Sequence, residues 1–304
     1  MQTCRTLSSA SSTRVHAAWL LAAMAGCASM SLFVVPARAT SAPSVLVWDN
    51  DTGETFCDPD AHGEVCVEVG TELGLVRAIT NNGGVASVVT QLPSDLSPYA
   101  AVYVTLGWST PASPAGQISA AEQVELADYI TSGHPVFLQG NDFAHDYNHT
   151  PLLDLFGAVF NGSGSDSTGN VSQLIGRSGT IAQGMVFSYP FGTVADTGVD
   201  DVLPGGNTPG DIVFDDQNGP GKAMSSPSEG GSPRGKSRGG GGPTPQSVAR
   251  GRTVLFTTVY GAMPDGVPPA TKDVLMGRVL VNFGLLATPA RPTTWGGIKG
   301  LFSR

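Results

Sequence analysis

Basic residues are scarce in most of this 304-residue chain. Between residues 40 and 221 only Arg77 and Arg177 are basic, against 22 acidic residues, so this stretch has a net charge of −20. Residues 222–304 carry 11 bases and 3 acids, a net charge of +8. Because an acidic field repels phosphates, we do not expect the main body to bind nucleic acid. The same field can attract cations, or can simply keep the surface solvated.

Acidic residues are missing altogether from residues 1–39. Two arginines, Arg5 and Arg14, precede an apolar run that ends in Pro36-Ala37-Arg38-Ala39. A basic start, an apolar middle and small residues at the cleavage site are typical of a secretory signal peptide. We therefore expect export to the periplasm or the cell exterior, with cleavage after Ala39.

Cysteine is also rare, with four residues in the chain. Met24-Ala25-Gly26-Cys27 resembles a bacterial lipobox, so a lipoprotein anchored through Cys27 is the alternative to cleavage after Ala39. The mature chain keeps only Cys57 and Cys66, which are close in sequence. In an exported protein this pair predicts a local disulfide, and a two-cysteine metal site is the alternative.

Two segments have a composition unlike that of a folded core. Residues 217–247 are rich in Gly, Ser and Pro, which predicts a disordered insertion. Residues 287–304 form a C-terminal tail that we expect to be either a docking or sorting segment or a frayed terminus. Its apolar side chains recur at near-helical spacing: Trp295, Ile298, Leu301 and Phe302.

Short apolar strands alternate with helices in the remainder of the chain. Strands are predicted at residues 44–48, 85–89, 101–106, 135–138 and 253–258, and helices at residues 67–82, 119–132, 150–157 and 271–283. Strands without polar alternation are typical of a sheet covered on both faces, and this order of elements indicates parallel crossovers. The prediction is an α/β fold over residues 40–286, a flavodoxin-like, doubly wound, mostly parallel sheet with helices on both faces.

Polar side chains follow the predicted strand 135–138 almost at once. The candidate ligand-binding residues are Asn141, Asp142, His145 and Asp146. Ligands of open α/β sheets bind at the carboxyl ends of the strands, so this is where a site is expected. The ligand would be an unidentified polar molecule or a protein partner.

Acidic side chains follow the first strand in the same way. Asp49, Asp51 and Glu54 offer hard oxygen ligands that can converge on one calcium ion, although Gly53 departs from the EF-hand pattern. A solvated acidic loop is the alternative. The order Asp49-Asn50-Asp51-Thr52 also invites comparison with haloacid-dehalogenase-like phosphatases, but its threonine comes one place early and no lysine precedes Lys222.

Two histidines, His145 and His149, lie four residues apart beside Asp142 and Asp146. On a helix they would share a face and could hold zinc. Pro151 argues against helical geometry just before it, which favours a polar loop. The alternative function is a metal-assisted hydrolase that uses one of these histidines and the acidic residues.

Several stretches together resemble the class I glutamine-amidotransferase-like domain, in the form found in secreted bacterial proteins. They are Val45–Asp51, Leu96–Val104, Ile118–Gly133, Phe137–Ala144, Leu153–Phe160 and Val279–Gly284. The resemblance covers most of residues 44–286 and implies the fold described above. The sugar-utilisation branch of the same fold is also similar.

The catalytic set of that family is incomplete in this chain. Active members carry a cysteine at a sharp elbow after the central strand, with a histidine and a glutamate later. Here the corresponding positions read Gln139, Gly140, Asn141 and Asp142, and no histidine follows His149. The resemblance therefore implies a secreted, non-catalytic domain, a pseudoenzyme with a binding or structural role.

Overall fold

The computed structural model describes residues 41–61, 66–108, 117–163, 171–189, 199–206, 208–219, 221–226 and 250–287. The predicted signal peptide, Cys27 and the tail from residue 288 lie outside the described residues. In the described part, no helix is both long enough and apolar enough to span a bilayer.

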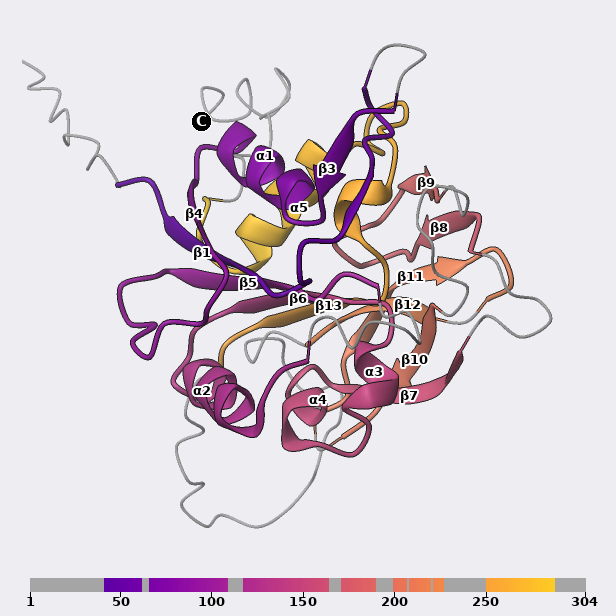
Figure 1. Cartoon of the computed structure of the whole chain (residues 1–304). Coiled ribbons are helices and arrows are strands. Elements are labelled where there is room, and N and C mark those ends of the chain that lie inside the picture. Colours follow the sequence, from indigo (N-terminus) through magenta and orange to yellow (C-terminus); the bar gives the residue numbers. More distant parts are fainter. Residues whose placement is uncertain are drawn as a thin grey trace, which may run out of the picture. The chain divides into compact units, whose positions relative to one another are not determined.

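Five parallel strands form the centre of the molecule (Figure 1). They are β1 (Ser44–Asp49), β4 (Val85–Val89), β5 (Ala101–Thr105), β6 (Val136–Gln139) and β13 (Thr253–Phe256). Their order in the sheet is β4-β1-β5-β6-β13, and every neighbouring pair is parallel. Numbered along the chain this is 2-1-3-4-5, the order of flavodoxin-like folds, so the predicted fold class is confirmed.

Helices cover both faces of these strands (Figure 1). One face carries α1 (Leu73–Asn81) and α5 (Lys272–Asn282), and the other carries α2 (Ala120–Thr131), α3 (Phe143–Asp146) and α4 (Pro151–Leu155). Successive side chains of a strand point to opposite faces. Val45 and Val47 accordingly belong to the apolar cluster that includes α1 and α5, while Leu46 and Trp48 belong to the cluster that includes α2 and α4.

The start of α2 agrees with its sequence, but its buried face does not. Ser119 and Glu122 form the expected capping box. The spacing of Val124, Ala127 and Ile130 predicts that these three side chains point inward. Ile130 is buried together with Leu126 and Tyr129, but Val124 is 60% exposed. The apolar residues of this short helix are compatible with either of two buried faces. Packing against the sheet determines which face is buried.

The helix expected from residue 67 begins only at Leu73, because the residues before it form a hairpin. β2 (Thr55–Cys57) pairs antiparallel with β3 (Glu68–Gly70). The predicted disulfide between Cys57 and Cys66 closes this hairpin, with 5.1 Å between the Cα atoms. A disulfide is compatible with an extracellular location.

An antiparallel extension continues the sheet beyond β13. It comprises β7 (Ala158–Ser163), β8 (Gln173–Gly176), β9 (Val186–Ser188), β10 (Asp200–Pro204), β11 (Asp211–Asp216) and β12 (Gly221–Ser225). β12 pairs antiparallel with β13 and so joins the extension to the parallel strands. The short 3₁₀ turn η1 (Tyr260–Ala262) follows β13.

The prediction of a disordered insertion over residues 217–247 was wrong at its start. β12 lies within this range, and its Lys222, Ala223 and Met224 are buried. A composition averaged over the whole segment hides one five-residue strand, whose burial depends on partners elsewhere in the chain. Residues 227–249 lie outside the described residues.

Candidate functional site at the carboxyl edge of the sheet

The strand register brings polar side chains together at the carboxyl ends of β1, β5 and β6. Asp49 lies beside Thr105, and Thr105 lies beside Gln139. In a 2-1-3-4-5 sheet the connections diverge next to β1, which opens a crevice between β1 and β5. The residues at this edge are therefore the first candidates for a site.

A buried hydrogen-bond network fills the floor of this edge. The hydroxyl of Thr71 donates to Asp51 Oδ2 and also lies within hydrogen-bond distance of Thr105 Oγ1. Gln139 Nε2 donates to Thr71 O at 3.1 Å and to Thr105 Oγ1 at 2.8 Å. Gln139 Oε1 accepts from the backbone N–H of Tyr260 at 2.8 Å. Because these groups satisfy one another, the network fixes the strand ends in place.

Three carboxylates converge above this network. One oxygen each of Asp49, Asp51 and Glu72 lies within 4.8 Å of the others, and among the described residues they form a group that could hold a metal ion. Burial, followed by the charges of Asp51 and Glu72, raises the pKa of Asp49 to about 7. We call these three residues the acidic triad.

The structure thus groups two of the three predicted calcium ligands and replaces the third. Glu54 Oε2 instead accepts from the backbone N–H of Trp108 at 2.7 Å, which ties the loop after β1 to the loop after β5. Asp51 Oδ1 accepts from Gly53 N at 2.8 Å and from Glu54 N at 3.2 Å. Glu72 is distant in sequence and directly precedes α1. It joins the other two carboxylates because the chain enters that helix near the end of β1, and the sequence alone did not predict this contact.

A buried asparagine lies in the turn after β6, where the sequence resemblance places the elbow. Asn141 is 1% exposed, its N–H donates to Gly107 O at 3.2 Å, and its carbonyl accepts from Asp200 N at 3.0 Å. Among the described non-glycine residues, a positive φ occurs only at Thr52 and His149. The turn after β6 therefore lacks the strained backbone that presents a nucleophile at an elbow.

The other candidate ligand-binding residues lie in α3 or directly before it. His145 Nδ1 lies 3.0 Å from Asp146 Oδ1, and both side chains are exposed. His149 comes after α3 has ended and is exposed, so the two histidines do not share a helical face. In the described part of the chain, neither histidine belongs to a group that could hold a metal.

Asp200 on β10 is a site residue that the sequence did not reveal. It is fully buried beside α3, and its Oδ2 accepts from the backbone N–H of His145 at 2.7 Å. Its Oδ1 has no hydrogen-bond partner among the described residues. Burial, helped by the charges of Asp142 and Asp146, raises the pKa of Asp200 to about 8. The sequence pattern before β11 was too weak to predict a strand at this position.

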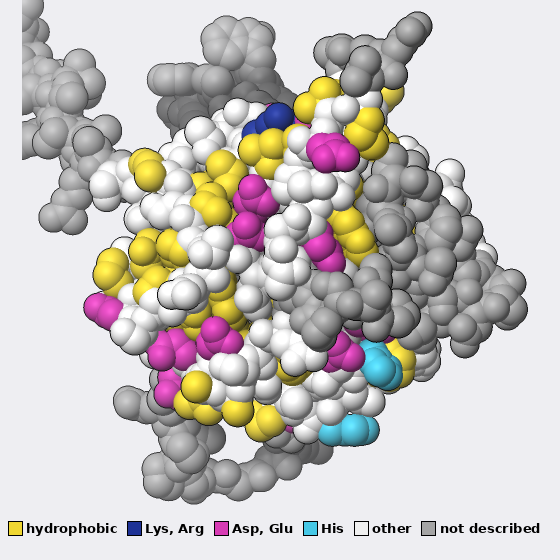
Figure 2. Space-filling model, viewed as in Figure 1, with side chains coloured by type: hydrophobic (Ala, Val, Ile, Leu, Met, Phe, Trp, Pro, Cys, Tyr) yellow, Lys and Arg dark blue, Asp and Glu magenta, His cyan; other side chains and the backbone are white. Residues whose placement is uncertain are grey.

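The surface around these residues is acidic. In the view of Figure 2, acidic side chains are spread over the molecule, and basic ones show at one place near the top. Two nearby bases already have acidic partners outside the triad. Arg77 pairs with Asp58 at 2.5 Å, and Lys272 pairs with Asp60.

Comparison with known proteins finds structural neighbours of low sequence identity. No protein-family model matches the chain. No curated protein matches it either. Among solved structures, a ThuA-like protein from Parabacteroides merdae is 10% identical with a TM-score of 0.43, covering 83% of this chain and 94% of its own. The N-terminal domain of mmIFT52 is 11% identical with a TM-score of 0.48, covering 82% and 99%.

A third structure is only partly covered by the similarity. A cold-adapted β-galactosidase from a Rahnella species is 12% identical with a TM-score of 0.45, covering 83% of this chain and 33% of its own. At these identities and TM-scores, none of the three structures assigns a role to this chain.

Proposed function

We propose that this chain is an exported, non-catalytic domain of amidotransferase-like fold that binds calcium at the carboxyl end of β1. The convergence of Asp49, Asp51 and Glu72 within 4.8 Å carries the proposal. The elbow residues Gln139 to Asp142 include no cysteine, and Cys57 is paired with Cys66, which supports a role without acyl transfer. The amidotransferase-like assignment rests on the sequence resemblance and on the 2-1-3-4-5 strand order.

Charge balance favours a cation over a neutral ligand at the acidic triad. Carboxylates this close repel one another; burial is the largest cause of the raised pKa of Asp49, and this repulsion adds to it. Arg77 and Lys272 pair with Asp58 and Asp60, outside the triad. Calcium takes roughly six to eight oxygen ligands, of which the triad would supply part and water the rest.

A thermal-shift titration tests the calcium proposal. Mature protein stripped with a chelator should gain stability when calcium is added, by about 2.7 kcal/mol at a concentration of 100 times Kd. Asp49→Asn and Glu72→Gln should each weaken this response at least about tenfold, because each removes a charged ligand. Asp128→Asn, an exposed position on α2, is the matched control and should respond like the wild type. An unchanged response in Asp49→Asn would contradict the proposal.

Calcium binding should also depend on pH in a defined direction. The pKa of Asp49 is raised to about 7, so below that value a cation must displace a proton from this side chain. We expect the affinity to fall as the pH is lowered from about 8 to about 5, and to fall less steeply in Asp49→Asn. Isothermal titration calorimetry in two buffers of different ionisation enthalpy would detect the released proton.

The alternative function, a metal-assisted hydrolase using His145 or His149, has a direct test. We expect no ammonia release from glutamine and no turnover of ester or phosphate substrates, with or without calcium or zinc. An Asn141→Ala/Asp142→Ala variant gives the background. Turnover that disappears in His145→Ala or in Asp49→Asn would replace the non-catalytic proposal with the hydrolase.

A further inference from the structure

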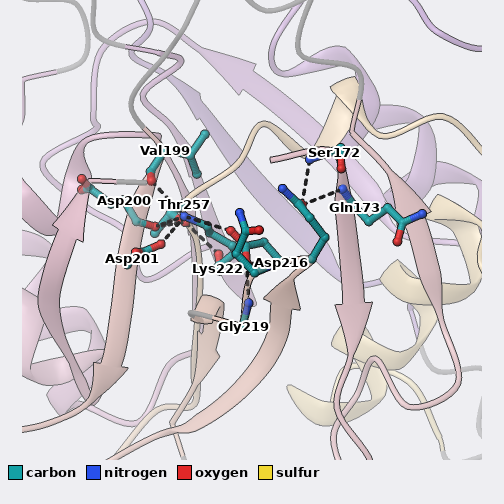
Figure 3. A network of polar contacts seen from close by, with 11 residues as sticks. Ser172, Gln173, Val199, Asp200, Asp201, Asp216, Gly219, Lys222 and Thr257 are labelled. Carbon is teal, nitrogen blue, oxygen red and sulfur yellow. Dashed lines mark hydrogen bonds and ion pairs between the residues drawn. The ribbon is translucent and has the colours of Figure 1, made fainter. Parts of the chain in front are cut away.

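Lys222 on β12 is completely buried and lies among acidic residues of the neighbouring strands (Figure 3). Its Nζ contacts Asp201 Oδ1 and lies 3.9 Å from Asp216 Oδ2. The same Nζ donates to Val199 O at 3.0 Å and to Asp200 O at 3.4 Å. The two carboxylate side chains are also largely buried, at 14% exposed for Asp201 and 5% for Asp216.

The strand pairing holds the amine and the carboxylate of Asp201 against each other. β10 and β12 are antiparallel, with Val202 opposite Gly221. Asp201 and Lys222 are the residues next to that pair on the two strands, so both backbones are fixed. Reacting groups held in contact and shielded from water can reach very high effective concentrations.

The two backbone carbonyls also determine how a neutral amine would be oriented. A neutral Nζ has two hydrogens and one lone pair. If the two hydrogens remain on the carbonyl oxygens of Val199 and Asp200, the lone pair faces the carboxyl group of Asp201. A lysine amine in this orientation is a nucleophile in contact with a carboxyl group.

We propose that Lys222 and Asp201 join in an intramolecular isopeptide bond, with Asp216 acting as the proton shuttle. This goes beyond the calcium-binding role and does not depend on it. The bond would link β10 to β12, near the junction between the antiparallel extension and the parallel strands.

The reaction is a condensation that loses one water molecule. The ammonium of Lys222 first gives a proton to Asp216, and the resulting acid protonates the carboxylate of Asp201. The amine then attacks the carboxyl carbon of Asp201, and a new C–N bond forms. One C–O bond of Asp201 breaks, Asp216 relays the second amine proton to the departing oxygen, and water leaves. The net change converts one ammonium and one carboxylate into an amide and water, with Asp216 restored.

Asp216 is held in position for this relay. Its Oδ1 accepts from the backbone N–H groups of Asn218 at 2.7 Å and Gly219 at 2.8 Å. Its Oδ2 is the oxygen that faces Lys222. One oxygen therefore anchors the side chain, and the other faces the amine at 3.9 Å, a separation that must shorten before a proton passes between them.

Intact-mass measurement of the folded, non-reduced mature protein decides the question. We expect a mass lower than the sequence mass by one water molecule, in addition to the two hydrogens lost in the Cys57–Cys66 disulfide. Digestion should yield one branched peptide pair in which the segments carrying residues 201 and 222 are joined. Lys222→Met should show the full mass. Asp216→Asn should show the full mass or a much slower loss of water, because the proton relay is gone.

A matched control variant should leave the reaction intact. Asp211→Asn, an exposed position at the start of β11, should still lose the water. Because the wild-type mass alone is decisive, a failure of Lys222→Met to fold does not matter. A folded wild-type protein with the full mass, apart from the disulfide hydrogens, would overturn the proposal and leave Lys222 as a buried ion pair.

Discussion

At the scale of single residues, the buried carboxylates of the sheet edge differ in how many hydrogen bonds their oxygens accept. Asp51 is buried but accepts hydrogen bonds from Thr71, Gly53 and Glu54. Asp200 is equally buried, yet one of its oxygens has no partner among the described residues. Hydrogen bonds to the charged form favour ionisation and burial opposes it. The pKa of Asp200 is therefore raised from 3.8 to about 8.

This raised pKa predicts how stability depends on pH. Between the two pKa values the folded state binds more protons than the unfolded state, so the free energy of unfolding falls as the pH rises from about 4 to about 8. Asp200→Asn should flatten this dependence, because the amide keeps an oxygen for the His145 N–H and carries no charge. Urea denaturation across this pH range measures the effect, with the exposed Asp128→Asn as control. Parallel profiles for the wild type and Asp200→Asn would contradict the prediction.

At the scale of elements, β12 is a paired strand inside the Gly-rich segment 217–247. Ser226 N donates to Thr253 O at 2.9 Å, and Thr253 N donates to Ser226 Oγ at 2.7 Å. These bonds extend the pairing of β12 with β13, so residues 226 and 250, which flank the undescribed residues 227–249, belong to neighbouring antiparallel segments. A short turn suffices to connect antiparallel strands.

Replacement of residues 227–249 by a short Gly-Ser linker separates their contribution to stability from that of β12. The free energy of unfolding should change by less than about 1 kcal/mol, because loop-closure entropy varies slowly with loop length. Deletion of residues 221–225 removes β12 and its buried side chains and should prevent stable folding. Thermal unfolding of both variants provides the measurement. A large destabilisation by the linker would mean that residues 227–249 pack against the domain.

At the scale of the whole molecule, the parallel strands and the antiparallel extension share one apolar core. Phe256 on β13 lies at their boundary, with ring-centroid distances of 5.1 Å to Phe137 on β6 and 5.7 Å to Phe214 on β11. Phe187 on β9 continues the row at 6.0 Å from Phe214. The two halves should therefore unfold together.

Truncation at this boundary tests the shared core. Phe256→Ala should lower the free energy of unfolding by about 3–5 kcal/mol, through lost burial and the cavity that remains. Unfolding should stay a single transition when followed by calorimetry and by circular dichroism. Val88→Ala, at a half-exposed position on the edge strand β4, should change stability by no more than about 0.5 kcal/mol. Two separate transitions in the wild type would refute the shared core.

The sequence by itself determined the features that depend on neighbouring residues. Apolar runs such as Val45–Trp48 gave the buried parallel strands, and Ser119 with Glu122 gave the start of α2. The spacing of Cys57 and Cys66 gave the disulfide. The capping pair and the two cysteines lie within about ten residues of each other, and a strand's apolar run is itself local, so local chemistry contains this information.

Only the tertiary structure decided which distant residues meet. Glu72 joins Asp49 and Asp51 because the chain turns into α1 above the end of β1. Lys222 meets Asp201 and Asp216 because β12 pairs with both β10 and β11. Burial of such polar groups is set by strand register and by the cover of other elements, neither of which leaves a periodic pattern in the sequence. The acidic triad and the Lys222 cluster therefore became visible only in the fold.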